Sequence, residues 1–550
     1  MKASELFVKC LENEGVEYIF GVPGEENADF MIALEDSKSI EFVLCRHEQG
    51  AAFMADVYGR TTGKSGVCLG TLGPGATNLI TGVADANMDR APLIVLTGQA
   101  DSKRLHKESH QAMDVVGMFK PVTKWATSVI NPHNIPEIVR KAFKLAETEK
   151  PGACHIELPE DIAAMDVSGE APLPIRKIRR PVCDSKVFNQ GLELIRSAKR
   201  PIILAGNGAI RKRASKQLRL FAETNGISVI NTFMGKGAVD RNAPECLFTA
   251  GLQSRDHVSC AIDRADLVIA IGYDLVEYHP RLWNDGGNKK IVHIDFLPAE
   301  TDKDYAPELE IIGDIAHTLW MLNERTDEEP LGFDLAVNAG YREEMQKDFD
   351  EYKDDTTEGS IRPQKVLSDV RAVLGEADIL LSDVGAHKMW IARYYQCNDP
   401  NTCLISNGFC SMGFALPGAM AAQMVNPGKK VMAICGDAGF LMNVQDMETI
   451  RRLELPVVCM IWEDHQYGLI AWKQQNHFGK HTDLAFTNPE FVKLAESFGW
   501  EGYRVNNAAD LKPTLEKAYE SKVPALIVLP IDYRENDLLT KRLGSIPCSI

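Results

Sequence analysis

Residues 429–469 read KKVMAICGDAGFLMNVQDMETIRRLELPVVCMIWEDHQYGL, and they contain the clearest fold signal in the chain. Two short apolar runs, VMAIC and PVVCMIW, flank a segment with helical spacing, which predicts a strand–helix–strand unit of a parallel sheet. The first run ends in Gly436-Asp437-Ala438-Gly439 and the second in Glu463-Asp464. Because parallel strands end at the same edge of a sheet, we expect these carboxylates to lie close together where ligands bind.

The turn after the first strand combines glycine with a carboxylate. Glycine lets a backbone approach a phosphate, and a helix N-terminus attracts anions. A carboxylate at Asp437 would repel a phosphate unless a divalent cation lay between them. Mg²⁺ is commonly held by one or two carboxylates together with phosphates and water, so Asp437 and Asp464 are candidate ligands. A Gly-Asp-x-Gly sequence alone more often marks a tight turn; the second acid, one helix and one strand later, favours a site.

The same alternation of short strands and helical segments continues through the rest of the chain. It predicts an α/β fold of three doubly wound parallel-sheet domains. The expected limits are 1–165, 188–325 and 362–540. Residues 1–165 and 362–540 show a generally similar succession of strands and helices.

Composition excludes several classes of protein. The 550 residues are 45% hydrophobic and 25% charged, with a net charge of −17 and no clustered Lys/Arg stripe, so we expect no nucleic-acid partner. The 13 cysteines are scattered without a C-x-x-C pair, which predicts reduced thiols in a cytoplasmic protein rather than a disulfide framework or a zinc site. No apolar run reaches the length of a membrane span, and the N-terminus lacks a signal-peptide core, so no membrane partner is expected.

The segment from Gly436 to Asp464 resembles the signature of the thiamine-diphosphate enzyme superfamily. That signature is a Gly-Asp-Gly turn followed, one helix and one strand later, by Asn-Asn or an Asp-containing variant. The resemblance implies that Asp437, Asp464 and the main-chain oxygen of Gln466 hold Mg²⁺ on the diphosphate of thiamine diphosphate. Ala438 replaces the usual second glycine, a mild departure because a backbone N–H makes that contact.

Three further segments resemble family motifs in the expected order. GVPGEEN (21–27) resembles the opening turn, SDVGAHKMWIARYY (382–395) resembles the segment that covers the diphosphate, and SNGFCSMGFALPGAM (406–420) resembles the loop that holds the aminopyrimidine. In that loop, Met412 would be the apolar wedge that keeps the cofactor bent, although a methionine is otherwise more often simple core. The cofactor-binding residues implied by the resemblance are Pro23, Gly24, Glu48, Gly385, Ala386, His387, Asn407, Gly408, Met412, Gly436, Asp437, Ala438, Gly439, Tyr467, Gly468 and Leu469.

Glu48 stands between the apolar run IEFVLC (40–45) and a helix rich in small residues. From the residues alone, a glutamate here interacts with the helix dipole. The resemblance implies a catalytic role instead, in which Glu48 exchanges a proton with the pyrimidine of the cofactor. A carboxylic acid does so best when its pKa lies near neutrality, and desolvation moves a carboxyl in that direction. Gln111 matches a family glutamine near the reacting centre and is implied to orient a substrate carbonyl or carboxylate.

The middle of the chain narrows the resemblance to the acetolactate synthase branch, and within it to the catabolic, FAD-independent members. The similar segments are HQAMDVVGMFKPVTKWA (110–126), ADLVIAIGYDLVEYHPRLWN (265–284) and PIDYREN (530–536). FAD is not expected, because the region from Thr232 reads TFMGKGAVDRNAPECLFTAG where flavin-containing members have a Gly-Met-His-Gly-type segment. Residues 1–165, 188–325 and 362–540 then correspond to pyrimidine-binding, central and diphosphate-binding domains.

The implied activity is decarboxylation of pyruvate and ligation to a second pyruvate, giving 2-acetolactate and CO₂. Since the family builds each cofactor site from the first and third domains of two subunits, the resemblance implies a homodimer at least, with a homotetramer as the expected assembly.

Two positions depart from the branch pattern and leave alternatives open. Catabolic members usually have glutamine where this chain has Cys410 and near Lys473, and a changed hydrogen-bonding set alters substrate discrimination. The first alternative is a 2-oxo-acid decarboxylase or a carboligase with another 2-oxo acid or aldehyde acceptor. The second is a non-catalytic relative that retains the cofactor, and the third is a nicotinamide dehydrogenase, suggested only by AGNGAI (205–210).

Overall fold

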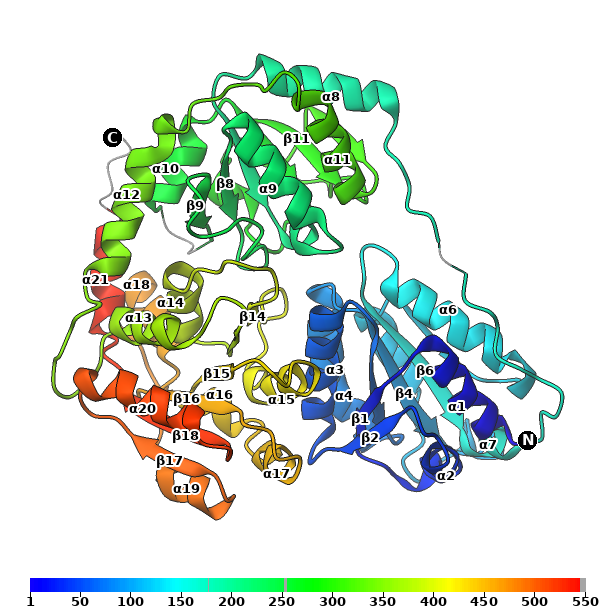
Figure 1. Ribbon diagram of the computed structural model, residues 1–550. Coiled ribbons are helices and arrows are strands. Elements are labelled where there is room, and N and C mark those ends of the chain that lie inside the picture. The colour runs from blue at the N-terminus through cyan, green and yellow to red at the C-terminus, as the bar shows by residue number, and fades with distance from the viewer. Residues whose placement is uncertain (177, 252–254, 545–550) are drawn as a thin grey trace.

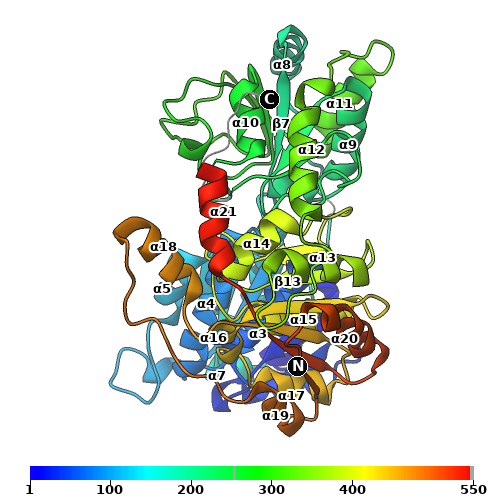
Figure 2. The same cartoon turned by 90° about the vertical axis from the view of Figure 1, so that its left-hand side faces the viewer.

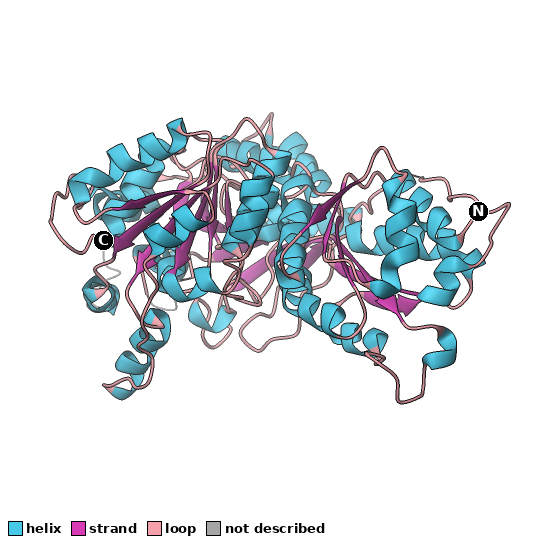
Figure 3. Ribbon diagram, turned by 90° about the horizontal axis from the view of Figure 1, so that it is seen from below, coloured by secondary structure: helices cyan, strands magenta, loops and turns pink. Residues whose placement is uncertain are grey.

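The computed structural model describes residues 1–176, 178–251 and 255–544. Three six-stranded sheets, with helices packed against their faces, follow one another along the chain (Figures 1 and 3). Every strand pair in the three sheets is parallel. The predicted α/β class with three doubly wound domains is confirmed, whereas the exact domain limits stay a prediction.

The first sheet has the strand order β2-β1-β3-β4-β6-β5. Its strands are β1 (Tyr18–Gly21), β2 (Glu41–Leu44), β3 (Gly66–Gly70), β4 (Leu93–Gln99), β5 (Trp125–Ser128) and β6 (Ala153–Pro159). Its helices are α1 (Ala3–Glu14), α2 (Ala28–Glu35), α3 (Glu48–Thr62), α4 (Pro74–Met88), α5 (Val115–Phe119), α6 (Ile135–Glu147) and α7 (Glu160–Ala164). The central strands are buried at every residue, as sheets covered on both faces require.

The third sheet repeats this topology in the order β14-β13-β15-β16-β18-β17, which explains the rhythm shared by the two sequence blocks. Its strands are β13 (Ile379–Ser382), β14 (Cys403–Ile405), β15 (Val431–Gly436), β16 (Val458–Glu463), β17 (Glu501–Arg504) and β18 (Ala525–Pro530). Its helices are α13 (Pro363–Val373), α14 (Ala386–Tyr394), α15 (Ala415–Val425), α16 (Asp437–Leu441), α17 (Asp446–Arg452), α18 (Gly468–Phe478), α19 (Phe491–Ser497), α20 (Ala508–Glu520) and α21 (Arg534–Gly544). Strand order reverses between β13 and β15, and between β1 and β3 in the first sheet, so each has a switch point where ligands bind.

The central sheet has a different order, β12-β11-β10-β7-β8-β9, which is the arrangement of dinucleotide-binding folds. Its strands are β7 (Pro201–Ala205), β8 (Ser228–Asn231), β9 (Cys246–Thr249), β10 (Leu267–Ile271), β11 (Lys290–Asp295) and β12 (Leu309–Ile312). Its helices are α8 (Ser185–Ser197), α9 (Ala214–Asn225), α10 (His257–Arg264) and α11 (Ile315–Thr326), and α12 (Ala336–Asp350) leads to the third domain.

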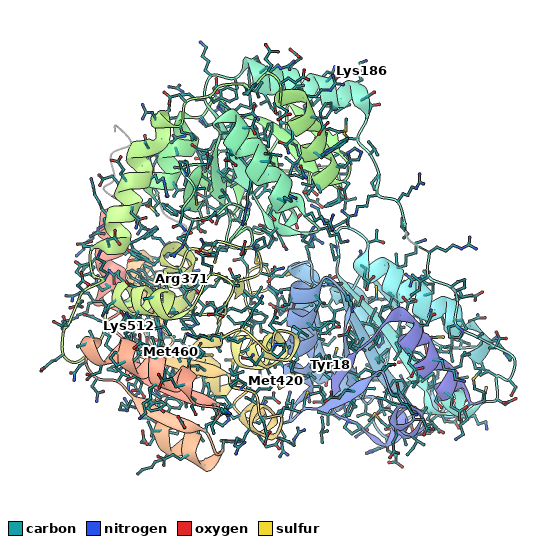
Figure 4. All side chains as sticks on the ribbon, viewed as in Figure 1. Tyr18, Lys186, Arg371, Met420, Met460 and Lys512 are labelled. Carbon is teal, nitrogen blue, oxygen red and sulfur yellow. The ribbon has the colours of Figure 1, made fainter. Side chains whose placement is uncertain are left out.

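Helices α3 and α15 hold the first and third domains together. Phe53 of α3 packs edge-to-face on Phe414 with ring centres 5.8 Å apart. A Cβ on Gly418 would lie 2.8 Å from a methyl of Val57, so glycine is needed for this close approach. Met420 of α15 lies at the same junction (Figure 4). The two domains therefore share one hydrophobic core.

Among the described residues, no helix has both the length and the apolarity that a membrane crossing requires.

Candidate active site

Asp437 and Asp464 meet at the carboxyl ends of the neighbouring strands β15 and β16, next to the switch point of the third sheet, as the strand ends predict. Oδ2 of Asp437 accepts hydrogen bonds from the backbone N–H groups of Asp464, at 3.2 Å, and His465, at 2.8 Å, and from Nδ2 of Asn488, at 2.8 Å. These three donors fix the carboxylate of Asp437 against the start of the 464–468 turn. The carbonyl of Gln466, the third expected ligand, lies in this turn and accepts a hydrogen bond from Gly468 at 2.9 Å.

Asp464 carries an unsatisfied oxygen. Its Oδ2 is buried and has no hydrogen-bond partner among the described residues. Burial, together with the negative charge of Asp437, raises the pKa of Asp464 to about 7. A side chain on Gly468 would collide with this oxygen, so the glycine keeps its surroundings open. Two adjacent carboxylates and a carbonyl form an all-oxygen donor set of the kind that fits Mg²⁺.

The described residues contain no group of three or more His, Cys, Asp or Glu side chains placed to hold a metal ion. A cation bound at Asp437 and Asp464 would therefore need backbone oxygens, phosphates or water to complete its coordination.

The same edge of the sheet offers anion-binding groups. Helix α14 begins directly after Gly385, and α18 begins at Gly468, so two helix N-termini belong to this edge. Nε2 of His387 is buried without a hydrogen-bond partner in the described part of the chain, and burial lowers the pKa of His387 to about 3, which keeps the ring neutral. A Cβ on Gly436 would lie 3.3 Å from the His387 ring, so little space separates these two elements. These groups fit the diphosphate of thiamine diphosphate beside a cation.

The loop that carries Met412 is fixed to the end of β13 by Asp383. Its carboxylate accepts hydrogen bonds from the N–H groups of Gly413, at 2.8 Å, and Phe414, at 3.2 Å. Burial raises the pKa of Asp383 to about 7. The methyl of Met412 lies 3.7 Å from the position of a Cβ on Gly439, which places the expected wedge directly above the Gly436–Gly439 turn.

Asn407 and Gly408 are held by the first domain. Asp89, at the end of α4, accepts from the N–H groups of Asn407, at 2.8 Å, and Gly408, at 2.7 Å. Arg60 in turn pairs with Asp89 at 3.0 Å and donates to the carbonyl of Ile405 at 2.9 Å. The start of the loop expected to hold the aminopyrimidine is thus tied to α3 and α4.

Glu48 and its surroundings lie at the carboxyl edge of the first sheet. Glu48 is 8% exposed, and its Oε2 accepts a hydrogen bond from Nδ2 of Asn78 at 2.9 Å. Its Oε1 lies 3.3 Å from the position of a Cβ on Gly75, near the start of α4. Gln111 approaches the same helix start, since its Cβ lies 3.0 Å from the Cβ position on Gly73. The two expected catalytic residues therefore share one corner of the domain.

Pro23 and Gly24 complete this corner. They follow β1, and a side chain on Gly24 would collide with Thr71 at the end of β3, the other strand of the switch point.

The first and third domains meet beside Glu48, where the N–H of Arg46 donates to Asp446 at 3.1 Å. Among the described residues, no hydrogen bond or ion pair links Glu48 to Asp437, Asp464 or His387. Helix α18 projects from the third domain (Figure 2) and buries only Ala471. Tyr467, Ile470 and Phe478 leave apolar surface exposed there. The roles of Tyr467, Gly468 and Leu469 in cofactor binding stay a prediction.

The positions that depart from the branch pattern differ in their surroundings. Lys473 is exposed on α18. Cys410 is exposed as well, but its Sγ accepts a hydrogen bond from Nζ of the buried Lys388 at 3.0 Å. Lys388 was not singled out by the sequence, because its contact with Cys410 depends on tertiary structure.

Other supporting residues were missed for the same reason. Asn78 and Asp89 lie in no motif. Asp383 lies in the 382–395 segment but was not singled out, although it could have been noticed as a carboxylate directly after a buried strand.

At the nucleotide edge of the central sheet, Glu277 contacts the turn after β7. Glu277 accepts hydrogen bonds from the N–H of Asn207 through both carboxylate oxygens, at 3.0 and 3.1 Å. A Cβ on Gly206 would lie 2.6 Å from the Cα of Tyr273, so the two loops are in direct contact. A carboxylate thus occupies the anion position of the AGNGAI turn, which weakens the case for a nicotinamide dehydrogenase.

Comparison with known proteins agrees with the geometry. Profiles of the thiamine pyrophosphate enzyme family match in order along the chain: its N-terminal TPP binding domain at residues 1–118, its central domain at 188–322 and its C-terminal TPP binding domain at 383–529. Each match falls on one of the three sheets.

Relatives extend the likeness over nearly the whole chain. An acetolactate synthase of Bacillus subtilis is 33% identical, covering 99% of this chain and 96% of its own length. A catabolic acetolactate synthase of Raoultella terrigena is 36% identical over 98% of this chain and 97% of its own. A probable acetolactate synthase large subunit of Methanocaldococcus jannaschii is 36% identical over 97% and 93%. The chain therefore belongs to the thiamine pyrophosphate enzyme family, in its acetolactate synthase branch.

Proposed function

We propose that this protein uses thiamine diphosphate and Mg²⁺ to decarboxylate pyruvate and to ligate the product to a second pyruvate, giving 2-acetolactate and CO₂. The observation that carries the proposal is the pair Asp437 and Asp464 at the carboxyl ends of β15 and β16, where a buried oxygen of Asp464 has no partner among the described residues. Full-length likeness to acetolactate synthases of three organisms supports the choice of reaction.

In this proposal each residue has a stated task. Asp437, Asp464 and the Gln466 carbonyl hold Mg²⁺, and the groups around Gly385, His387 and Gly436 receive the diphosphate. Thiamine diphosphate, when bound, supplies the electron sink for loss of CO₂.

The remaining tasks concern the reacting end of the cofactor. Met412 would pack against thiamine diphosphate. The Glu48 carboxyl would hold and release the proton at this end of the site, and Asn78 fixes its orientation. Gln111 orients the substrate.

The decisive experiment is product analysis by mass spectrometry. Purified protein with pyruvate, Mg²⁺ and thiamine diphosphate should yield 2-acetolactate and CO₂, and the proposal fails if no acetolactate forms. Glu48→Gln should reduce turnover by about 10²–10⁴-fold, the usual contribution of a general acid–base. Turnover that Glu48→Gln abolishes also excludes a non-catalytic relative.

A second candidate is carboligation to another 2-oxo acid or aldehyde, which the environment of Cys410 favours because that side chain borders the reacting centre in place of glutamine. A panel of 2-oxo acids and aldehydes offered beside pyruvate separates it from the first.

We further propose a homodimer at least, with a homotetramer as the expected assembly, in the cytoplasm. The exposed apolar residues of α18 support a site shared between subunits. Eleven of the described cysteines are free thiols, as expected in a reducing compartment, whereas Cys260 is disulfide-bonded. Mixing Glu48→Gln with Asp437→Asn protein should restore activity, because mixed dimers contain one intact site; no recovery after subunit exchange would contradict sharing.

FAD is not part of the proposal. The contact of Glu277 with the Asn207 N–H supports this view, since it fills the anion position of the central sheet.

A further inference from the structure

Lys388 is a buried cation without a carboxylate partner. It lies on α14 and is 4% exposed. Its Nζ donates to Sγ of Cys410 at 3.0 Å and lies 5.8 Å from the ring centre of Phe233. No ion pair within residues 1–176, 178–251 and 255–544 includes Lys388. Since an unpaired buried charge is costly, a counter-ion is expected to come from a ligand.

Two other buried lysines show how this chain otherwise satisfies such groups. Lys365 pairs with Asp369 at 2.8 Å. Lys236 donates to Oγ1 of Thr249 and to the carbonyl of Tyr395, both at 2.9 Å, and burial lowers its pKa. Lys388 has neither a carboxylate nor a pair of oxygen acceptors.

The position of Lys388 links it to the reacting end of the site. Cys410 belongs to the loop between Asn407 and Met412, and its thiol donates to the Asn407 carbonyl at 2.7 Å. Met412 contacts the Gly436–Gly439 turn, as described above. Cys410 is exposed, so the thiol that accepts from Lys388 can be reached from solvent.

We propose that Nζ of Lys388 binds the carboxylate of the acceptor 2-oxo acid and makes the site selective for acceptors that carry one. This inference rests on the proposed function. The donor loses its carboxylate as CO₂, and a cation bound to that group would stabilise the ground state and oppose its loss. The acceptor keeps its carboxylate into 2-acetolactate, so a fixed positive charge helps throughout ligation. The small side chain of Cys410 leaves room that a glutamine would fill.

The test compares acceptors with and without a carboxylate. Pyruvate alone reports acetolactate, and pyruvate with acetaldehyde reports acetoin, whose acceptor has no charge. Lys388→Gln should raise the KM for acceptor pyruvate about 10-fold or more, the size of a lost charge-assisted hydrogen bond. It should change acetoin formation by less than about twofold, so that the acetolactate-to-acetoin ratio falls. Lys388→Arg keeps the charge and should restore most of the ratio.

Lys365→Gln is the matched control, because it removes another buried lysine of the same domain whose partner is a protein carboxylate. It should leave the product ratio unchanged.

A second readout needs no turnover. Alkylation of Cys410 by iodoacetamide is followed by peptide mass spectrometry on the full chain without thiamine diphosphate. Pyruvate should slow alkylation of the wild-type protein, whereas acetone should not, and Lys388→Gln should lose the protection.

The outcomes separate the two proposals. Wild-type protein that makes no acetolactate refutes the proposed function, whereas an unchanged ratio and unchanged protection in Lys388→Gln overturn this inference alone.

Discussion

Helix α14 contains two buried cations that the fold treats differently. Arg393 is 0% exposed and pairs with Asp256 at 2.8 Å and with Asp348 at 2.6 Å. Lys388 lies about one and a half turns earlier on the helix, and its ammonium has as partners among the described residues the thiol of Cys410 and the ring of Phe233. The ion pairs of Arg393 tie α14 to the central domain and to α12. Lys388 instead contacts the 407–412 loop through Cys410. The contrast teaches that a buried charge with protein partners serves the fold, and one without them marks a place for a ligand.

The largest expected effect on stability comes from replacing Arg393, the buried cation of α14 that has carboxylate partners. Arg393→Met leaves the buried Asp256 without its cation and removes one of the two arginines that pair with Asp348. Burial alone would raise the pKa of Asp256, but Arg393 holds it below its usual value. We expect the free energy of unfolding to fall by about 3–5 kcal/mol, measured by chemical denaturation. Arg534→Met is the control, since Arg534 lies in solvent in its pair with Asp532 and ion pairs of exposed groups contribute little to stability. Equal losses in the two variants would break the comparison.

Buried carboxylates also differ in whether the protein supplies their partners. Asp446 has an oxygen without a partner among the described residues, and its ionisation should make the stability of the fold depend on pH. Asp446 accepts from the N–H of Arg46 at 3.1 Å, its Oδ2 has no partner within the described residues, and burial raises its pKa from 3.8 to about 6. The folded state therefore prefers the neutral acid. Its stabilising contribution is present below pH 4 and is lost as pH rises through about 6.

Asp446→Asn should remove this dependence. A shift of about two pKa units corresponds to about 3 kcal/mol, so the stability of the wild type relative to the variant should fall by about that amount between pH 4 and pH 7. The exposed Asp537→Asn is the control. Parallel stability curves for wild type and Asp446→Asn would show that the buried acid is not the cause.

Asp464 is a buried carboxylate whose expected partner is a bound Mg²⁺ ion. Adding Mg²⁺ and thiamine diphosphate to chelator-treated protein should raise the free energy of unfolding by about 2.7 kcal/mol at 100 times the dissociation constant. Asp464→Asn should lose most of this gain, because it removes the negative charge that faces the unsatisfied position. Lys365→Gln should keep the gain. Ligand-induced stabilisation that survives in Asp464→Asn would place the cation elsewhere.

The sequence predicted the parts of this molecule that depend on local pattern. Strand ends and glycine turns placed Asp437 and Asp464 at one sheet edge, and the three parallel sheets were expected from alternating strands and helices. Contacts between distant segments were not accessible in this way. Asn78 of α4 donates to Glu48 of α3, and Asp89 of the first domain accepts from the N–H of Asn407 in the third domain. The long side chain of Lys388 donates to the thiol of Cys410. A long polar side chain has many rotamers, and only packing selects the one that is used.

The smallest expected effect on stability belongs to Lys388, and it is the sharpest test of the contrast on α14. Lys388→Met replaces a buried, unpaired ammonium by an apolar chain of similar volume, and replacing such charges is often neutral or stabilising. We therefore expect a change of less than about 1 kcal/mol in the free energy of unfolding, against the loss of several in Arg393→Met. The measurement is the same chemical denaturation, carried out without substrate. If Lys388→Met destabilises the protein as strongly as Arg393→Met, the thiol of Cys410 already satisfies the ammonium, and the need for a ligand carboxylate disappears.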